Sequence, residues 1–156
     1  MPSRFHQMPL SPVSPKDLHD YCAEWSDPLG QFADNESKIA YVRQRLPALL
    51  ENQLLITALL NDIKQNYGGA ERRRHMLFDN EWRLHMDAKR RFSVRMYLYR
   101  PGEVTFVHDH SSWGVLGSAS GEMEIVKYRR KDDSQKNGYA LLEETERTTC
   151  TPGRTD

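Results

Sequence analysis

Apolar residues in the first half of the chain recur every three or four positions, the spacing that gathers side chains on one face of an α-helix. Ile39, Val42 and Leu46 form one such run. A second run follows Pro47 and ends before Tyr67, with the members Leu49, Leu50, Ile56, Leu59, Leu60 and Ile63. The pattern predicts two helices with core-facing sides, broken or kinked at Pro47, because proline removes a hydrogen-bond donor and clashes with the preceding turn.

A shorter helix is predicted before these runs. Ser14 and Pro15 are typical of the N-cap and first position of a helix. We expect this helix to reach about Trp25 and to stop before residues 27–30, a turn-forming Asp-Pro-Leu-Gly stretch. Residues 1–14 hold three prolines and little periodicity, so we expect them to form a mobile N-terminal arm.

The period changes to two from about Glu81, which indicates β-strands. One face of the clearest strand holds Phe92, Val94, Met96 and Leu98, and the other holds Ser93, Arg95, Tyr97 and Tyr99. Further short strands are predicted at residues 104–110, 113–119, 122–129 and 139–147. The chain therefore reads as α+β, with strands spaced as in a small antiparallel barrel. We expect one domain, made of the arm, a helical lead-in at 15–69 and the barrel at 70–156.

Length and composition describe an ordinary globular domain. The 156 residues are 38% hydrophobic and 28% charged, and 22 basic residues balance 22 acidic ones. A net charge of zero gives no reason to expect nucleic acid or an anionic membrane as a partner, and no apolar run reaches the ~18 residues of a membrane span. The N-terminus lacks the apolar stretch of a secretory signal. Cys22 and Cys150 are too few for a disulfide scaffold, so we expect a reducing, cytoplasmic setting.

The clearest candidate for chemistry is the pair His108 and His110, separated by one residue. On a strand, residues at this spacing point to the same face. Two imidazoles on one side of a strand are suited to share a divalent metal such as iron or zinc. The spacing alone is weak support, because a purely structural role for both histidines explains it equally well.

The surroundings of the pair resemble the first motif of the cupin superfamily: glycine, five residues, His-x-His, three or four residues, glutamate, six residues, glycine. Gly102, Gly114 and Gly121 keep these spacings around the histidines, with Gly114 where the glutamate ligand usually stands. A cupin without that carboxylate resembles the cysteine dioxygenase (thiol dioxygenase) family. Residues 91–94, 101–102, 107–110 and 113–115 look like its bacterial members, and the resemblance extends over roughly residues 36–156.

This resemblance implies a cupin (jelly-roll) barrel and an enzyme that oxidises a small thiol, cysteine or 3-mercaptopropionate, to its sulfinic acid with O2. It implies Fe(II) held by three neutral histidines, two of them His108 and His110, which leaves positions on the metal for the thiolate and O2. It also allows a monomer.

The third histidine belongs to a second cupin motif, whose opening glycine Gly153 resembles. That histidine would fall about eight residues past Asp156. We therefore expect the last barrel strands and the third ligand to lie beyond this chain, so that an inactive truncation is one alternative.

Four residues are candidates for substrate binding. The family binds the substrate carboxylate with an arginine on an earlier strand, and alignment on Phe92 places Trp82 at that position, with Arg83 next to it. A shift of one residue reverses the face of a strand, so a surface role for Arg83 stays open. Tyr97 and Tyr99 match pocket-lining positions of the family. Trp113 follows the histidine pair closely, and for all three aromatic residues ordinary packing is the alternative.

The four other histidines, which are His6, His19, His75 and His85, are expected to be structural or exposed. Two other functions stay open. One is a cupin that binds a different metal and acts on a small acid or sugar, although Gly114 argues against it because most such cupins keep the carboxylate. The other is a cupin remnant that binds a ligand or a partner without turnover, which the absence of a third histidine ligand supports.

Overall fold

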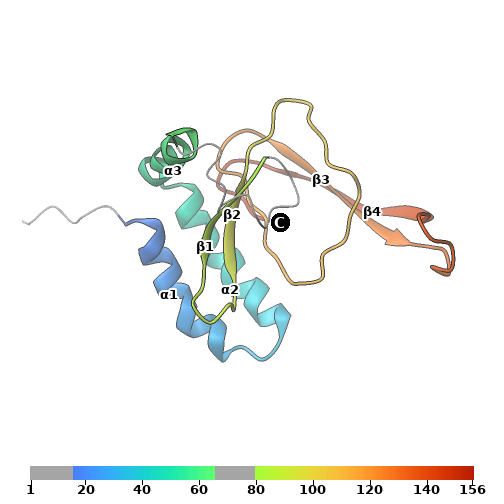
Figure 1. Ribbon diagram of the computed structural model, residues 1–156, viewed down its shortest axis with the longest axis horizontal. Helices are drawn as coiled ribbons and strands as arrows, with labels where there is room; N and C mark the ends of the chain where they lie inside the picture. The colour runs from blue at the N-terminus through green and yellow to red at the C-terminus, as the bar shows by residue number, and fades with distance from the viewer. Residues whose placement is uncertain (1–15, 66–79) are drawn as a thin grey trace, which may run out of the picture.

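The computed structural model describes residues 16–65 and 80–156, in which three helices precede four strands (Figure 1). The helices are α1 (Leu18–Gln31), α2 (Asn35–Leu50) and α3 (Gln53–Gln65). The strands are β1 (Glu81–Met86), β2 (Ser93–Tyr97), β3 (Met123–Arg130) and β4 (Leu142–Cys150). This order confirms the α+β class. The expected arm at 1–14 lies outside the described residues.

Helix α1 begins later than predicted, because Asp17 and not Ser14 caps it. The Asp17 carboxylate accepts a hydrogen bond from the Asp20 backbone N–H, and the Asp20 carboxylate accepts one from the N–H of Asp17. This reciprocal capping box satisfies two N–H groups that the first turn leaves unpaired. Ser14 lies outside the described residues.

The predicted stop before Pro28 was wrong, and the break predicted at Pro47 falls three residues later, after Leu50, whereas a kink at Pro47 stays a prediction. Helix α1 continues through Pro28 to Gln31, and α2 continues through Pro47 to Leu50. An interior proline costs about 3 kcal/mol, but each is followed by leucines that the continuing helix buries. Leu29 is 2% exposed and Leu49 4%, and full burial of such a side chain contributes about 1.5–3 kcal/mol. Burial therefore offsets much of the cost of each proline.

One hydrophobic cluster joins the helices to the first hairpin. Its buried members are Tyr21, Cys22, Trp25, Leu29, Val42, Leu49, Leu55, Ile56 and Phe92. Phe92, which directly precedes β2, lies with its ring centroid 6.4 Å from that of Trp25. Val94 and Met96 of β2 pack against the same cluster, so the apolar face of the strand is the one predicted from its period-two pattern. The β1–β2 hairpin is thereby fixed on the helical layer.

The described strands form two separate antiparallel pairs, β1–β2 and β3–β4, and not a closed barrel. The strand predicted at 104–110 was wrong, and the one at 113–119 is reduced to isolated bridges from Gly117 to Thr155 and from Ser118 to Pro152. A strand is defined by ladder hydrogen bonds to a neighbouring strand, and residues 104–110 belong to no strand or bridge of the described chain. No helix in this part of the chain is long and apolar enough to cross a membrane.

Opposite charges face each other across the β3–β4 hairpin. In the register, Lys127 lies opposite Glu146 and Arg129 opposite Glu143. The Lys127 Nζ lies 3.0 Å from a Glu146 carboxylate oxygen, and Arg129 Nη2 lies 2.6 Å from one of Glu143. Lys127 also pairs with Asp156 at 3.0 Å, which ties the end of the sequence to β3.

Candidate metal and substrate site

His108 and His110 lie on the long loop that leaves β2 and returns to β3 (Figure 1). Both residues are exposed. Their ring centroids are 4.9 Å apart and the ring planes meet at 62°. The two imidazoles thus lie together, although residues 104–110 form no strand and the strand geometry from which this was predicted is absent.

A hydrogen bond sets the proton position on His108. Its Nδ1 lies 2.9 Å from the backbone carbonyl oxygen of Phe106. A carbonyl oxygen only accepts, so Nδ1 carries the hydrogen in this contact and the lone pair is on Nε2. Metal-binding histidines in proteins commonly use this arrangement, in which a carbonyl holds one ring nitrogen and the other faces the metal. The Phe106 ring also packs edge-on against the His108 ring, at 5.5 Å between centroids.

The described residues bring no third ligand to this pair. Within them, one group of three side chains is arranged to hold a metal ion, and it consists of Asp17, His19 and Asp20, all exposed. The two aspartates of that group already accept the capping hydrogen bonds of α1. The third imidazole predicted for His108 and His110 stays a prediction for sequence beyond Asp156, and His6 and His75 lie outside the described residues.

Three of the four predicted substrate residues lie on one face of the β1–β2 hairpin. Glu81 is opposite Tyr97 and Arg83 is opposite Arg95, and residues opposite each other or two apart share a face. Tyr97 and Tyr99 stack with their ring centroids 6.2 Å apart and their planes at 8°. The structure therefore groups Arg83 with both tyrosines on the side away from the helices.

The same register places Trp82 and Arg83 on opposite faces of the hairpin. Trp82 is opposite Met96, and its side chain is 6% exposed on the core side of the hairpin. Arg83 points to the other side and is partly exposed. Of the two neighbours, Arg83 is therefore the one on the tyrosine face.

The sequence reasoning missed a buried ion pair on this face. The Arg95 guanidinium pairs with the carboxylate of Glu81, which is only 1% exposed. Burial raises the pKa of Tyr97, and the negative charge of Glu81 raises it further. Burial also raises the pKa of Tyr99, followed by the charge of Glu103. Both tyrosines are therefore neutral hydroxyl donors at physiological pH.

Trp113 is partly buried and packs against the helical core cluster, together with Val115. This contact agrees with ordinary packing, which was the alternative role for Trp113. A role of Trp113 in lining a substrate pocket stays a prediction. A Cβ placed on Gly114 would meet nothing within 4 Å. The space beside Gly114 is therefore open to solvent.

A second polar region lies where α1 meets the β1–β2 turn. It is a hollow of roughly 340 Å³ lined by His19, Cys22, Ala23, Ser26, His85, Asp87, Ala88 and Arg91. The His85 ring packs on Phe92 at 5.7 Å, its Nε2 is buried without a hydrogen-bond partner, and burial lowers its pKa. These contacts give His85 a packing role, in line with its structural interpretation from the sequence.

Neither a scan against models of protein families nor a search of solved structures finds a match to this chain. The resemblance to the thiol dioxygenases therefore rests on the motif around His108 and His110.

Proposed function

We propose that this chain is an iron-dependent thiol dioxygenase of the cupin type, which oxidises cysteine or 3-mercaptopropionate to the sulfinic acid with O2. The observation that carries the proposal is the state of the histidine pair. Two adjacent imidazoles lie on one loop, and the carbonyl of Phe106 holds His108 in the tautomer that binds a metal through Nε2.

The described residues provide two imidazole ligands for Fe(II). His108 and His110 would hold it, and neither contributes negative charge, which suits a metal that is to bind an anionic thiolate. When bound, Fe(II) supplies coordination positions for the thiolate and for O2. The chain itself sets the tautomer of His108 and leaves the position of Gly114 empty, where a carboxylate would otherwise compete with the thiolate for the metal.

The polar face of the β1–β2 hairpin is proposed to bind the carboxylate of the substrate. Arg83 provides the positive charge, and Tyr97 and Tyr99 provide neutral hydroxyl donors, since the ordinary tyrosine pKa of about 10 already lies well above physiological pH and burial raises both pKa values further. A carboxylate accepts such hydrogen bonds strongly, since a charged acceptor roughly doubles their strength. Arg95 is less suited to this role because its guanidinium already pairs with Glu81.

The setting proposed for this chemistry is the cytoplasm. Cys22 and Cys150 are both free thiols and both buried. Free buried thiols are usual in a reducing compartment, where ferrous iron and thiol substrates are also maintained.

Iron binding tests the proposal at the histidine pair. Fe(II) is added anaerobically to the full chain and to the variants His108→Ala and His110→Ala, and bound iron is measured after removal of the excess. We expect each substitution to lower the affinity about 10–100-fold or more, because removing even a supporting contact of a metal ligand has that effect. The variant His19→Ala is the matched control, since it removes the exposed Asp-His-Asp group and leaves the loop unchanged.

Turnover is measured separately, as O2 uptake and sulfinate formation with cysteine and with 3-mercaptopropionate. Iron bound through His19, or equal binding by all variants, would refute the proposed site. Retention of zinc or nickel in preference to iron would favour the cupin that acts on a different substrate. Iron bound at the pair without any sulfinate would favour the binding protein without turnover.

A further inference from the structure

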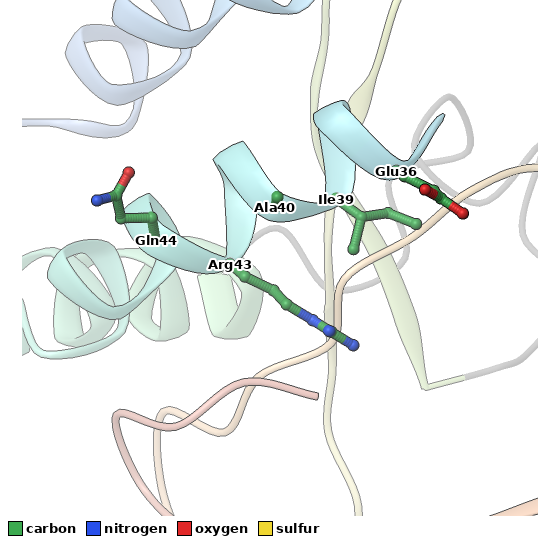
Figure 2. A pocket seen from close by; sticks show the side chains of 5 residues that line it. All are labelled: Glu36, Ile39, Ala40, Arg43 and Gln44. Carbon is green, nitrogen blue, oxygen red and sulfur yellow. The ribbon is translucent and has the colours of Figure 1, made fainter. Parts of the chain in front are cut away.

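The outer side of α2 carries a shallow hollow that the proposed thiol chemistry does not use. It has a volume of roughly 640 Å³ and is lined by Glu36, Ile39, Ala40, Arg43 and Gln44. All five belong to α2, so among the described residues no other element closes the hollow. Figure 2 shows Glu36, Ile39 and Arg43 in a row along one side of the helix. The surface is an open helix face with an apolar centre.

The charges on this face have a particular order. Glu36 stands at one end of the row and Arg43 at the other, with Ile39 and Ala40 between them. Glu36 and Arg43 are both exposed, and within residues 16–65 and 80–156 neither forms an ion pair. Seven residues of helix separate them by about 10 Å, which is too far for the two side chains to neutralise each other fully. An occupant that matches this face needs a positive and a negative group at the same separation, in reverse order.

We propose that the occupant is α2 of a second copy of this chain, packed antiparallel to the first. The midpoint of Glu36 and Arg43 falls between Ile39 and Ala40, so a two-fold axis there places Glu36 of each copy next to Arg43 of the other. The same axis brings Ile39 of one copy against Ile39 of its partner on one flank of the contact, and Ala40 against Ala40 on the other. A surface that meets itself in this way is the requirement for a symmetric dimer.

The side chains at the centre suit a close helix pair. Packed helices lie 8–10 Å apart, depending on the residues at the contact, and Ala40 keeps the distance at the short end while Ile39 supplies apolar area. The contact is small compared with standard interfaces, so the dimer is weak and forms at high protein concentration. The family resemblance allows a monomer, and the proposed dimer forms from that monomer. The dimer does not depend on the proposed enzyme activity.

Charge reversal tests this pairing directly. The dissociation constant of the full chain is measured by sedimentation equilibrium over about a hundred-fold range of concentration. Arg43→Glu places like charges at both ends of the contact, and we expect it to weaken self-association about ten-fold, equivalent to ~1.4 kcal/mol. Glu36→Arg has the same expected effect. The double variant Glu36→Arg, Arg43→Glu restores opposite charges and returns the dissociation constant to that of the parent.

Arg45→Glu is the control. It makes the same change of charge on α2, but on the side where Arg45 lies over the ring of Tyr41, and it leaves the dimer unaffected. Circular dichroism of each variant verifies that α2 still folds. A chain that stays monomeric at every concentration overturns the proposal. So does a dimer that Arg43→Glu leaves intact, or one that the double variant fails to restore.

Discussion

Substitution of Asp87 by asparagine tests how the hairpin that carries the candidate substrate residues is held on α1. The carboxylate of Asp87 is 3% exposed. Its Oδ1 accepts from Ser26 Oγ at 2.8 Å and Arg91 Nη2 at 2.7 Å. Its Oδ2 accepts from Arg91 Nε at 2.8 Å and from the backbone N–H groups of Lys89 and Arg91 at 3.0 and 3.2 Å. The carboxylate thus links the turn after β1 to helix α1.

The size of the effect follows from this count. Asparagine keeps one oxygen and replaces the other with an NH2 group, which faces at least two of the former donors. A hydrogen bond to a charged group contributes about 1.5–3 kcal/mol, and loss of one partner of a buried ion pair costs about 3–5 kcal/mol. Arg91 is 22% exposed and keeps a hydrogen bond to the Ser26 carbonyl, so water recovers part of the loss. We expect Asp87→Asn to destabilise the chain by about 3 kcal/mol.

Urea unfolding at neutral pH measures this difference. With a slope of about 1–3 kcal/mol/M, the midpoint should fall by about 1–3 M. The control is Glu143→Gln, which removes an ion pair whose two side chains are 65% and 45% exposed and should move the midpoint little. An Asp87→Asn midpoint equal to that of the control would refute the reasoning.

The pH dependence gives a second test of the same contact. The side chain of Arg91, through its hydrogen bonds, holds the pKa of Asp87 well below its usual range. Because the folded-state pKa is depressed, the contribution is complete above the unfolded value of about 3.9 and is lost as the pH falls through the folded value. The difference between parent and Asp87→Asn should therefore be largest at pH 7 and shrink in acid. A difference that stays constant into strong acid would contradict this origin.

Three further predictions follow from local geometry. Gly117→Ala should lower the free energy of unfolding by about 1–3 kcal/mol, because the added Cβ would lie 2.5 Å from a leucine methyl group and 3.1 Å from a backbone oxygen. Gly114→Ala is the control, since its Cβ would meet nothing within 4 Å. Thermal unfolding compares the two variants, and equal melting temperatures would contradict the prediction. Tyr97 and Tyr99 should ionise above pH 10, since burial raises the pKa of each. Because the chain holds seven tyrosines, the ultraviolet titration of the double variant Tyr97→Phe, Tyr99→Phe is subtracted from that of the parent, and a difference curve with a midpoint at or below about 10 would count against the prediction. Burial raises the pKa of Cys22 to about 12, so its thiol should react slowly with an alkylating reagent at pH 8 until urea unfolds the chain; fast reaction of the folded chain would contradict this.

The elements that the sequence predicts well are those whose pattern is local. Helices α2 and α3 follow from apolar residues at helical spacing, and the two faces of β2 follow from strict alternation. Gly102 and Gly121, which keep the motif spacing, both have positive φ, +79° and +74°, a backbone conformation that glycine adopts readily. In each case a few neighbouring residues decide the conformation, so the sequence alone is sufficient.

The elements that the sequence predicts poorly depend on contacts with residues far away in the sequence. Pro28 breaks a helix in isolation, yet α1 continues because Leu29 is buried in the core. Residues 104–110 have the alternation of a strand, with Val104 87% exposed and Phe106 68% exposed, but the described chain supplies no neighbouring strand. Local pattern cannot show whether a tertiary partner is present.

In the candidate site, too, local features follow from the sequence and features that depend on distant contacts do not. The common face of Tyr97 and Tyr99 follows from their spacing along a strand, whereas His108 and His110 lie close together on a loop, where spacing alone does not fix the face. The choice of Arg83 over Trp82 required the register of β1 against β2, and the Glu81–Arg95 pair required it too. Register is a property of two strands together, and therefore no motif in either strand reveals it.

The charge pattern of the β3–β4 hairpin has a consequence for solubility. Each strand carries mostly one sign, with Lys127, Arg129 and Arg130 on β3 and Glu143, Glu144 and Glu146 on β4. Inside the hairpin these charges attract. Between two molecules, β3 against β3 or β4 against β4 brings like charges together, which opposes these two pairings of exposed strand edges, whereas β3 against β4 brings opposite charges together. High salt screens both the repulsion and the attraction, so ionic strength sets which pairing of edges is favoured.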